Sequence, residues 1–345
     1  MMNQSIRIGT VGTSKIMRII QDAMRHVDGI DCSVVYSREL SRAEAFARDM
    51  EAAGSGPLKI TDSFDDLVTR EDVDVVYLAS PNRLHYEQAM RVMRAGKPVI
   101  IEKPVAILAE KVEDLHAAAL EHNVMFLEAI STLYMPNYLK LKNEILPRLG
   151  KLKKVRVAYG RYSSQYDAYK RGENPNVFSP AMEGGALNDM GVYCVHVAVD
   201  LFGEPDEVTC ERSYGPDGAD LCDEVVLYYK KDPLYGGDEG LTVQIGTSKI
   251  TNILNGIWLE GENGSFSFDN GEMHDFVNGG RAVIGGGEII LAEQGDENRM
   301  VYEQAAMRDC LLADDRPFFE KMYNQTLRVV KVLERAHADA AKRRR

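Results

Sequence analysis

Two charged residues and a proline follow a buried-looking apolar run at Glu102, Lys103 and Pro104. The run "PVIIE" is typical of a strand in a parallel sheet, and ligands bind such sheets beyond the carboxyl ends of the strands. Pro104 would end the strand and stiffen the turn, which would hold the Lys103 ammonium over a bound nicotinamide ring. These three residues alone leave a surface turn as the alternative.

A second predicted strand ends in the polar segment "SPNRLH". A helix, Gly96-Lys97-Pro98 and a strand separate it from "EKP", and this series favours a cleft over a surface turn. Carboxyl ends of parallel strands meet at one edge of a sheet, so both segments should reach the same ligand. We expect cofactor contacts at this edge from Ser80, Pro81, Asn82, His85, Glu102 and Lys103.

A third polar group comprises Asp189, Tyr193 and His196, in a predicted helix near residues 184–203. Positions i, i+4 and i+7 of a helix share one face, so the three side chains need a common partner. That partner is either a buried polar network or a bound molecule. For His196 alone we favour the buried network.

The first predicted strand-to-helix loop is "GTSKIM". A Gly-x-Gly-x-x-Gly loop at this place lets the backbone touch a dinucleotide pyrophosphate at a helix N-terminus. Gly12 matches, whereas Ser14 and Met17 replace the second and third glycines. Taken alone, this is a weak fingerprint in the right context. The residues expected to contact the dinucleotide are Gly12, Thr13, Ser14, Lys15 and Ile16.

The second predicted strand ends in "YSRE". An acidic residue here would accept a hydrogen bond from the ribose 2′-hydroxyl, whereas arginine favours a 2′-phosphate. Ser37 and Arg38 therefore predict NADP(H) in preference to NAD(H), and the neighbouring Glu39 leaves NAD(H) open. A solvated loop cation is the alternative for Arg38.

The elements that must position these residues change in character near residue 128. Before it, short apolar strands alternate with amphipathic helices, which requires a parallel sheet with helices on both faces. After it come one helix pattern, strands rich in Gly and Asn that indicate an antiparallel sheet, and a final helix from "NQTLRVVKVLERAHADA". We predict a dinucleotide-binding domain over 1–128 and a substrate-binding and oligomerisation domain over 129–345.

Composition excludes several classes of protein. A net charge of −12, from 41 basic and 53 acidic residues, argues against nucleic acid or an anionic membrane as the main partner. No apolar run approaches the ~20 residues that span a bilayer. The five cysteines show no metal-ligand spacing and indicate reduced thiols. We expect a cytoplasmic protein without a metal site.

The chain resembles the Gfo/Idh/MocA oxidoreductase family over essentially its whole length. The resemblance is carried by "SPNRLHYEQAMRVMRAGKPVIIEKP" and "EGGALNDMGVYCVHVAVDLFG", and less specifically by "LEGENGSFSFDN" and "NQTLRVVKVLE". It implies an N-terminal Rossmann doubly wound parallel sheet (α/β), followed by an α+β domain with a large, mostly antiparallel open sheet. That sheet commonly forms the oligomer interface, which implies a homodimer or homotetramer.

The resemblance also implies site residues. The family's lysine maps to Lys103, and its Gly-Gly-x-x-x-Asp segment maps to Gly184, Gly185 and Asp189. Family members place either His or Tyr four residues after the Asp. With Tyr193 at this position, the chain resembles the glucose–fructose oxidoreductase and dihydrodiol dehydrogenase branch. The missing His argues against assigning the mechanism or substrate of the inositol dehydrogenase type to this chain.

The implied reaction is reversible hydride transfer between a nicotinamide and a secondary alcohol or ketone of a sugar, polyol or related diol. Tyr193 is the expected acid/base, Lys103 its electrostatic partner and substrate orienter, and Asp189 binds a hydroxyl or fixes Lys103. The ordinary pKa values of Tyr and Lys, about 10 and 10.4, are both too high for this task, and a Lys103 ammonium beside Tyr193 would lower the pKa of the phenol. The roles of Lys103 and Tyr193 could be exchanged.

The loop "RYSSQYDAYKRGENPNVFSP" is the expected substrate loop. Polyol hydroxyls would bond to Tyr166, Asp167 and Arg171, with His196 as a further candidate. Sugars, cyclitols, sugar acids and dihydrodiols all fit this chemistry. Two other functions stay open, namely a dinucleotide-binding regulator without turnover and a glycosidase that uses NAD transiently.

Overall fold

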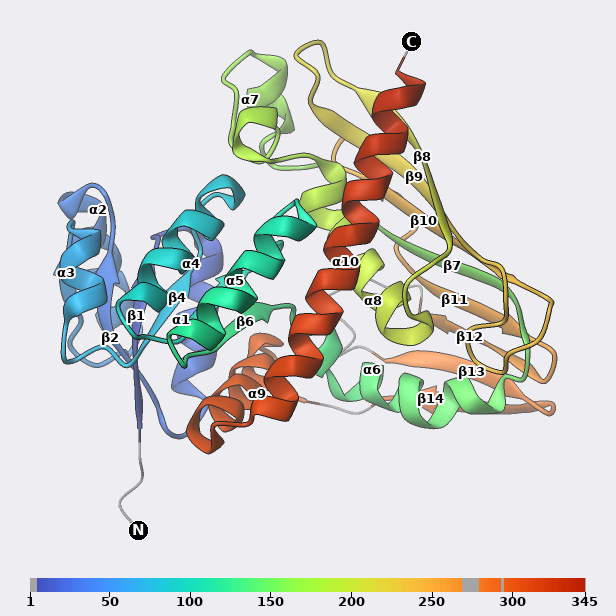
Figure 1. Cartoon of the computed structure of the whole chain (residues 1–345), viewed down its shortest axis with the longest axis horizontal. Helices are drawn as coiled ribbons and strands as arrows, with labels where there is room; N and C mark the ends of the chain where they lie inside the picture. Colours follow the sequence, from blue (N-terminus) through green and yellow to red (C-terminus); the bar gives the residue numbers. More distant parts are fainter. Residues whose placement is uncertain (1–4, 269–278, 293–294, 345) are drawn as a thin grey trace. The chain divides into compact units, whose positions relative to one another are not determined.

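The chain divides into two units, which the computed structural model describes over residues 5–268, 279–292 and 295–344 (Figure 1). Unit 1 comprises Met1–Ala106, Glu110–Ile130 and Asn298–Asn324, and unit 2 comprises Ile107–Ala109, Ser131–Glu297 and Gln325–Arg345. Residues 298–324 belong to unit 1, although the predicted second domain includes them. The last two residues of "LEGENGSFSFDN" lie outside the described residues.

Unit 1 is built on a six-stranded sheet with the order β3-β2-β1-β4-β5-β6, in which all neighbours are parallel. The strands are β1 (Ile6–Val11), β2 (Ile30–Tyr36), β3 (Lys59–Thr61), β4 (Val75–Leu78), β5 (Val99–Glu102) and β6 (Phe126–Ala129). Strands β4 and β5 are buried along their whole length, as strands with helices on both faces are. The predicted doubly wound sheet is confirmed, and its strand order reverses between β1 and β4, where such sheets bind ligands.

The helices of unit 1 present apolar stripes to this sheet. They are α1 (Lys15–Arg25), α2 (Leu40–Ala52), α3 (Phe64–Thr69), a 3₁₀ turn η1 (Asn82–Leu84), α4 (His85–Arg94), α5 (Ala109–Glu121), α9 (Met300–Ala313) and the first part of α10 (Arg316–Arg343). Helix α1, for example, buries Met17, Ile20 and Met24 at helical spacing. Burial of one helix face against the sheet is the physical cause of the helical spacing of apolar residues in the sequence.

Helix α9 has no counterpart among the predicted elements. Its buried face includes the polar residues Glu303 and Gln304 beside Met300 and Met307, so apolar residues alone do not show a 3.6-residue period. The helix is tied to unit 1 by the Asn298 side-chain amide, which donates to the Ile19 carbonyl at 2.8 Å. It covers the parallel sheet from a distant part of the sequence.

Unit 2 contains an eight-stranded sheet with the order β14-β13-β12-β11-β7-β10-β9-β8. The strands are β7 (Leu152–Gly160), β8 (Glu207–Tyr214), β9 (Asp220–Tyr229), β10 (Leu241–Ser248), β11 (Gly256–Gly261), β12 (Gly264–Phe268), β13 (Gly280–Ile284) and β14 (Gly287–Leu291). Every neighbouring pair is antiparallel except β7 and β10. The predicted mostly antiparallel sheet is confirmed.

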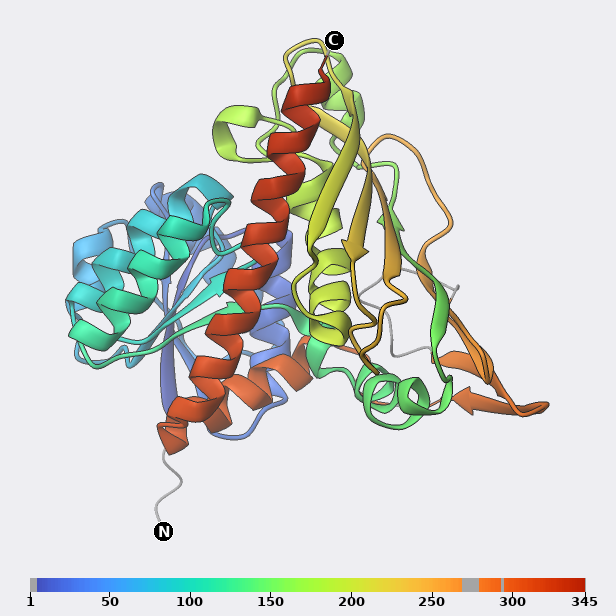
Figure 2. The same cartoon turned by 45° about the vertical axis from the view of Figure 1, so that its right-hand side comes forward.

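One face of this sheet carries helices, and in the described parts of unit 2 no helix covers the other face, called here the open face (Figures 1 and 2). Helix α8 (Val192–Phe202) and the C-terminal part of α10 lie on the same face (Figures 1 and 2). In β10 the buried Val243 and Ile245 alternate with the exposed Thr242 and Gln244, as a half-buried strand requires. The remaining helical pieces are η2 (Ser131–Tyr134), α6 (Pro136–Lys140), η3 (Leu141–Ile145), η4 (Leu146–Arg148), α7 (Tyr166–Lys170), η5 (Pro180–Met182) and η6 (Leu187–Gly191).

Two properties of the whole chain complete the description. All five cysteines are free thiols, and Cys194, Cys210 and Cys310 are buried, as small core residues commonly are. Among the described residues, no helix combines the length and the apolar character that crossing a membrane requires.

Candidate active site

At Gly12, the loop after β1 has the backbone conformation that a dinucleotide-binding loop requires. Gly12 has a φ of +112°, and a Cβ at this position would lie 2.9 Å from the Ala79 carbonyl oxygen. Only glycine adopts this conformation without strain. Ser14 is exposed at the N-terminus of α1, whereas Met17 is fully buried in the core of unit 1. The loop is therefore open to a ligand at Ser14, and Met17 fills the interior on the other side of the helix.

Ser37 and Arg38 follow β2 at the same edge of the sheet. The Ser37 backbone N–H donates to the Thr61 carbonyl at 3.2 Å, which fixes the turn. Arg38 is exposed, and the neighbouring Glu39 carboxylate is paired with Arg42 at 2.8 Å. The acidic side chain next to Arg38 is thus already engaged by another cation.

His85 ties together the two loops that follow β4 and β5. Its ring is 1% exposed, with Nε2 2.8 Å from the Ser80 carbonyl oxygen and Nδ1 2.9 Å from the Pro104 carbonyl oxygen. Burial lowers the pKa of His85. Ser80 Oγ donates to Gln88 Oε1 at 2.6 Å. A neutral imidazole has one N–H, so the ring donates to one of the two carbonyl oxygens and packs against the other. The expected contact of His85 with the cofactor stays a prediction.

Glu102 and Lys103 end β5, and their side chains lie in different surroundings. Glu102 is buried, accepts a hydrogen bond from the Tyr77 hydroxyl at 2.9 Å, and has its pKa raised by burial. Lys103 is half-buried, and the Lys103–Pro104 peptide bond is cis. Pro81 and Asn82, after β4, are also partly exposed. The predicted unit 1 residues thus gather at the carboxyl edge of the sheet, with Glu102 and His85 on the interior side.

Glu303 lies with Glu102 in a buried group of acids in unit 1. Its Oε2 has no hydrogen-bond partner within the described residues, and burial together with the Glu102 charge raises the pKa of Glu303 well above its ordinary value. A folded-state pKa above the unfolded value makes the folded chain bind the extra proton, so stability falls as pH rises above about 4.3.

We expect Glu303→Gln to raise the free energy of unfolding at pH 8 by about 1–3 kcal/mol, because the variant removes the cost of ionising a buried acid. Urea unfolding at pH 5 and pH 8 measures the effect, and the difference from wild type should shrink at pH 5. Glu87→Gln, at an exposed acid on α4, is the matched control. A gain from Glu303→Gln that does not change with pH would contradict this account.

Asp189 lies in η6, a π-helical turn directly before α8. Single π-helical turns are frequent at functional sites. A Cβ on Gly184 would lie 2.5 Å from a backbone oxygen, and one on Gly185, whose φ is +123°, would lie 2.7 Å from Asp220 Cβ. The two glycines are therefore needed for the close packing of the segment that carries Asp189.

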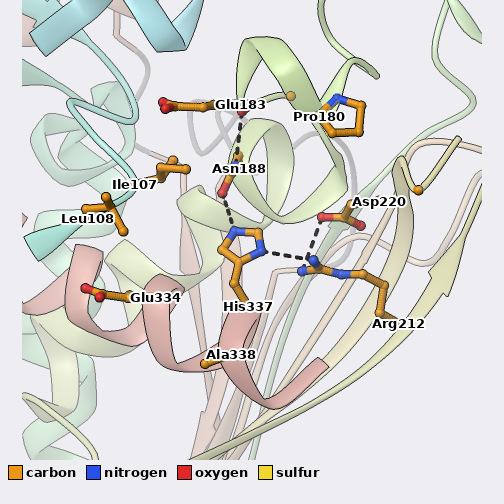
Figure 3. A pocket seen from close by; sticks show the side chains of 12 residues that line it. Ile107, Leu108, Pro180, Glu183, Asn188, Arg212, Asp220, Glu334, His337 and Ala338 are labelled. Atoms are coloured by element: carbon orange, nitrogen blue, oxygen red, sulfur yellow. Dashed lines mark hydrogen bonds and ion pairs between the residues drawn. The ribbon is translucent and has the colours of Figure 1, made fainter. Parts of the chain in front are cut away.

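A buried network of hydrogen bonds and ion pairs contacts this turn (Figure 3). The Leu187 N–H donates to Asp220 Oδ2 at 3.0 Å, and Arg212 Nη2 lies 3.4 Å from the same oxygen. Arg212 Nη1 is 2.9 Å from His337 Nδ1, and His337 Nε2 is 2.8 Å from Asn188 Oδ1. Arginine only donates, so Nδ1 accepts and Nε2 donates, which requires a neutral imidazole. Burial agrees with this, because it lowers the pKa of His337 to about 4.

The same network forms one wall of a cavity of about 400 Å³ within unit 2 (Figure 3). The lining residues are Ile107, Leu108, Pro180, Glu183, Gly184, Asn188, Arg212, Gly218, Asp220, Glu334, His337 and Ala338. Asp189 and Tyr193 do not line it. The cavity therefore adjoins the support of η6 and is separate from the residues predicted to carry the chemistry.

Tyr193 and His196 both lie on α8 and differ in access. Tyr193 is 8% exposed, and its ring packs edge-on against Tyr159 with centroids 5.7 Å apart. His196 is fully buried, and its carbonyl oxygen accepts a hydrogen bond from Gln325 at 3.0 Å. The preference for His196 as an interior residue agrees with this burial, and its assignment as a substrate contact stays a prediction.

The sequence-based expectations did not include Lys249, which follows β10. Its side chain is 1% exposed, and its ammonium donates a hydrogen bond to Asp189 Oδ2 within an ion pair. The carboxylate side of this pair is 34% exposed. The segment "TSKI" has no feature that indicates a buried lysine, because lysine after a strand is ordinarily solvated.

The predicted substrate loop is partly packed and partly exposed. Tyr166, on α7, packs on Tyr169 and Phe178 in an aromatic group. Asp167 accepts a hydrogen bond from the Tyr162 hydroxyl at 2.6 Å, and Arg171 is paired with Glu173 at 2.6 Å. These exposed polar groups bond to neighbours in the loop. Across the described parts of the chain, no three His, Cys, Asp or Glu side chains converge as metal ligands would.

Models of protein families match segments in both halves of the chain. The model GFO_IDH_MocA, described as "Oxidoreductase family, NAD-binding Rossmann fold", matches residues 6–129, and the GFO/IDH/MocA C-terminal domain matches residues 147–267. The first match covers the parallel sheet of unit 1, and the second covers Asp189, Tyr193 and Lys249.

Curated relatives and solved structures agree with these matches. An uncharacterized oxidoreductase of Escherichia coli (strain K12) is 36% identical over 260 residues, 75% of each chain. The scyllo-inositol 2-dehydrogenase (NADP(+)) of Bacillus subtilis (strain 168) is 33% identical over 264 residues, 76% of each chain. The human trans-1,2-dihydrobenzene-1,2-diol dehydrogenase is 28% identical over 69% of this chain and 75% of that one.

Among solved structures, a 3-ketoreductase from Actinomadura kijaniata in complex with NADP and TDP-benzene has a TM-score of 0.82 at 20% identity, covering 97% of this chain and 98% of that one. At this identity the likeness concerns the fold alone. The two family models and the two relatives named above with more than 30% identity decide the assignment. The residues matched by the family models include strands of both sheets. The chain therefore belongs to the Gfo/Idh/MocA family of oxidoreductases with an NAD-binding Rossmann fold.

Proposed function

We propose that the protein catalyses reversible hydride transfer between NADP(H) and a secondary alcohol or ketone of a sugar, polyol or related diol. The observation that carries the proposal is the ion pair of Asp189 with the buried Lys249, because it presents a partly exposed carboxylate one helical turn before Tyr193. The relatives act in the same chemical class by name, as an inositol dehydrogenase and a dihydrodiol dehydrogenase.

The residues of unit 1 fit a dinucleotide. The Gly12 turn leaves no room for a side chain, and the first turn of α1 has backbone N–H groups without intrahelical acceptors, which suit a pyrophosphate. Thr13, Ser14, Lys15 and Ile16 would hold that end, and Ser37 and Arg38 would hold the adenosine ribose. Ser80, Pro81 and Asn82 would approach the other half of the cofactor.

In the proposed mechanism, NADP(H) supplies or accepts a hydride when it is bound. Tyr193 takes the hydroxyl proton when an alcohol is oxidised and returns it when a ketone is reduced. The Lys103 ammonium orients the reacting oxygen and favours the deprotonated phenol of Tyr193. Asp189 accepts a hydrogen bond from a substrate hydroxyl. Tyr166, Asp167, Arg171 and His196 remain proposed substrate contacts.

The proposal is tested by fluorescence titration with NADPH and NADH, followed by absorbance of the reduced nicotinamide with a panel of aldoses, polyols and diketones. NADPH binding with substrate-dependent oxidation supports it. Binding without turnover on any panel member favours the regulator, or the glycosidase if a sugar is released. A chain that binds neither nucleotide would contradict the proposal.

Arg38 carries the proposed preference for NADP(H). We expect Arg38→Ala to raise the Kd for NADPH about 10–100-fold, because the variant loses a charge-assisted hydrogen bond to the 2′-phosphate. The Kd for NADH should change less than about 2-fold. The B. subtilis relative, named as NADP(+)-dependent, supports this assignment. Arg48→Ala on the exposed face of α2 is the control. Equal effects on both nucleotides would refute the role of Arg38.

The open face of the eight-stranded sheet is the proposed interface of a homodimer or homotetramer. Its side chains include the exposed Thr242 and Gln244, and the exposed apolar Leu254 and Ile290 lie in the same sheet region of unit 2. Light scattering of the purified protein measures the oligomer size. The free cysteines support the proposal that the protein works in the cytoplasm.

A further inference from the structure

Lys249 is a fully buried lysine whose charge is directed at one side chain. It follows β10, and its backbone N–H donates to the Leu221 carbonyl at 2.9 Å, which fixes the start of the side chain. The ammonium donates to Asp189 Oδ2. We infer that Lys249 is a positioning residue, which holds the Asp189 carboxylate ready to bind a substrate hydroxyl. The inference rests on the proposed function.

The ion pair is asymmetric in its access to solvent. The Lys249 side chain is 1% exposed, whereas that of Asp189 is 34% exposed. A buried ammonium requires a counter-charge, and within the described part of the chain Asp189 provides the acceptor that Nζ bonds. The lysine ammonium is therefore paired with Asp189, whose side chain keeps partial access to solvent.

An aromatic ring also contacts the lysine ammonium. Nζ lies 5.0 Å from the centroid of the Phe178 ring, a distance at which the ring face attracts a cation. Phe178 is fully buried and packs with Tyr166 and Tyr169 of α7. The proposed substrate loop is thus in contact with Lys249 through Phe178, so that loop and carboxylate are supported by one buried cation.

The position of Asp189 explains why such support matters. It lies in a π-helical turn, where the backbone is wider than in an α-helix and places side chains less regularly. The bond from Lys249 comes from the residue that follows β10 and is independent of that turn. Catalytic geometry is sensitive to small displacements, and an error of 1 Å costs on the order of 100-fold in rate.

The test is a double-mutant cycle on steady-state kinetics. Lys249→Met keeps the length and apolar stem of the side chain, and it should lower kcat/KM about 100-fold, mostly in kcat, as expected for a misplaced group. The Kd for NADPH should stay within about 2-fold, because Lys249 belongs to unit 2. If Lys249 acts through Asp189, the double variant Lys249→Met/Asp189→Asn should match Asp189→Asn alone within about 3-fold.

Lys142→Met is the matched control. Lys142 is paired at 2.7 Å with Asp200, which lies on α8, and the two side chains are 30% and 15% exposed. Its removal should lower the thermal midpoint and leave kcat/KM within about 2-fold, because that pair involves neither Asp189 nor Tyr193 and has no proposed catalytic role. Lys249→Gln provides a second, smaller variant, which must show the same kinetic loss if Lys249→Met does not fold.

The outcomes separate the inference from the proposed function. A wild-type protein without turnover on any substrate overturns the proposed function. A wild type with turnover, in which losses from Lys249→Met and Asp189→Asn multiply, shows that Lys249 acts generally on the fold and overturns the inference alone. Wild-type kcat/KM in either folded Lys249 variant also overturns it. Equal single and double variants support it.

Discussion

Replacing Lys103 by methionine is expected to lower kcat at least about 1,000-fold, within the range contributed by general acid–base groups, and to leave the Kd for NADPH within about 2-fold. Methionine keeps the reach of the side chain and removes the ammonium. In the proposed mechanism that charge orients the reacting oxygen and favours the deprotonated Tyr193. Stopped-flow absorbance of the reduced nicotinamide and a fluorescence titration measure the two quantities on the same preparation.

Lys59→Met is the control for this experiment, since Lys59 is an exposed lysine of unit 1 paired with Asp72 at 2.6 Å. Tyr193→Phe should reproduce most of the loss in kcat if Tyr193 is the acid/base. Wild-type turnover in Lys103→Met would remove Lys103 from the mechanism. A large loss of NADPH affinity would instead assign Lys103 to the binding of the cofactor.

Arg212→Met is expected to lower the free energy of unfolding by about 3–5 kcal/mol, the cost of leaving buried charges without their partner. The Arg212 side chain is 6% exposed, with Nε 2.6 Å from Asp223 Oδ1 and Nη2 3.4 Å from Asp220 Oδ2. Those carboxyl groups are 6% exposed or less. Urea unfolding followed by circular dichroism measures the loss.

The pH dependence of this loss has a defined sign. Burial and the nearby Asp223 charge raise the pKa of Asp220 well above its ordinary value, and removal of Arg212 would raise it further. An acid with a raised folded-state pKa costs stability as pH rises, so the loss from Arg212→Met should be larger at pH 8 than at pH 5.

Arg70→Met is the matched control, because Arg70 also bridges two carboxylates, Asp66 and Asp72, but at the surface of unit 1. There the side chains are 24–46% exposed, and the expected loss is below about 1 kcal/mol. Equal losses in Arg70→Met and Arg212→Met, or a loss at Arg212 that does not change with pH, would contradict the assigned role of burial.

The fold of unit 1 was largely predictable because its signals are local. An apolar run such as Val75–Leu78 indicates a buried strand, and glycines such as Gly12 and Gly96 indicate turns with a positive φ. Helix α9 was missed because it buries Glu303 and Gln304, and the need for a polar group in that part of the interior comes from Tyr77 and Glu102, far away in sequence.

Within the candidate site, only residues in segments that resemble the motifs of the family could be singled out from the sequence. Lys103 and Asp189 stand in such segments, whereas Lys249 becomes a buried partner only when the segment with Asp189 packs over the end of β10. The π-helical turn at Asp189 likewise has no local signal, because "LNDMG" also fits an ordinary helix. The His85 ring nitrogens lie within hydrogen-bond distance of two carbonyl oxygens, and the contact of His85 with the cofactor stays a prediction.

The placement of α9 and the first part of α10 in unit 1 has a consequence for biosynthesis. Phe126 packs edge-on against Phe319, and Cys310 contacts Met125, so β6 depends on the last segment of unit 1 to cover it. Between residues 130 and 298 the ribosome must synthesise most of unit 2, which takes roughly 10–30 s at bacterial and eukaryotic elongation rates. During that interval the nascent parallel sheet has an uncovered apolar surface, the kind of surface through which partly folded chains aggregate.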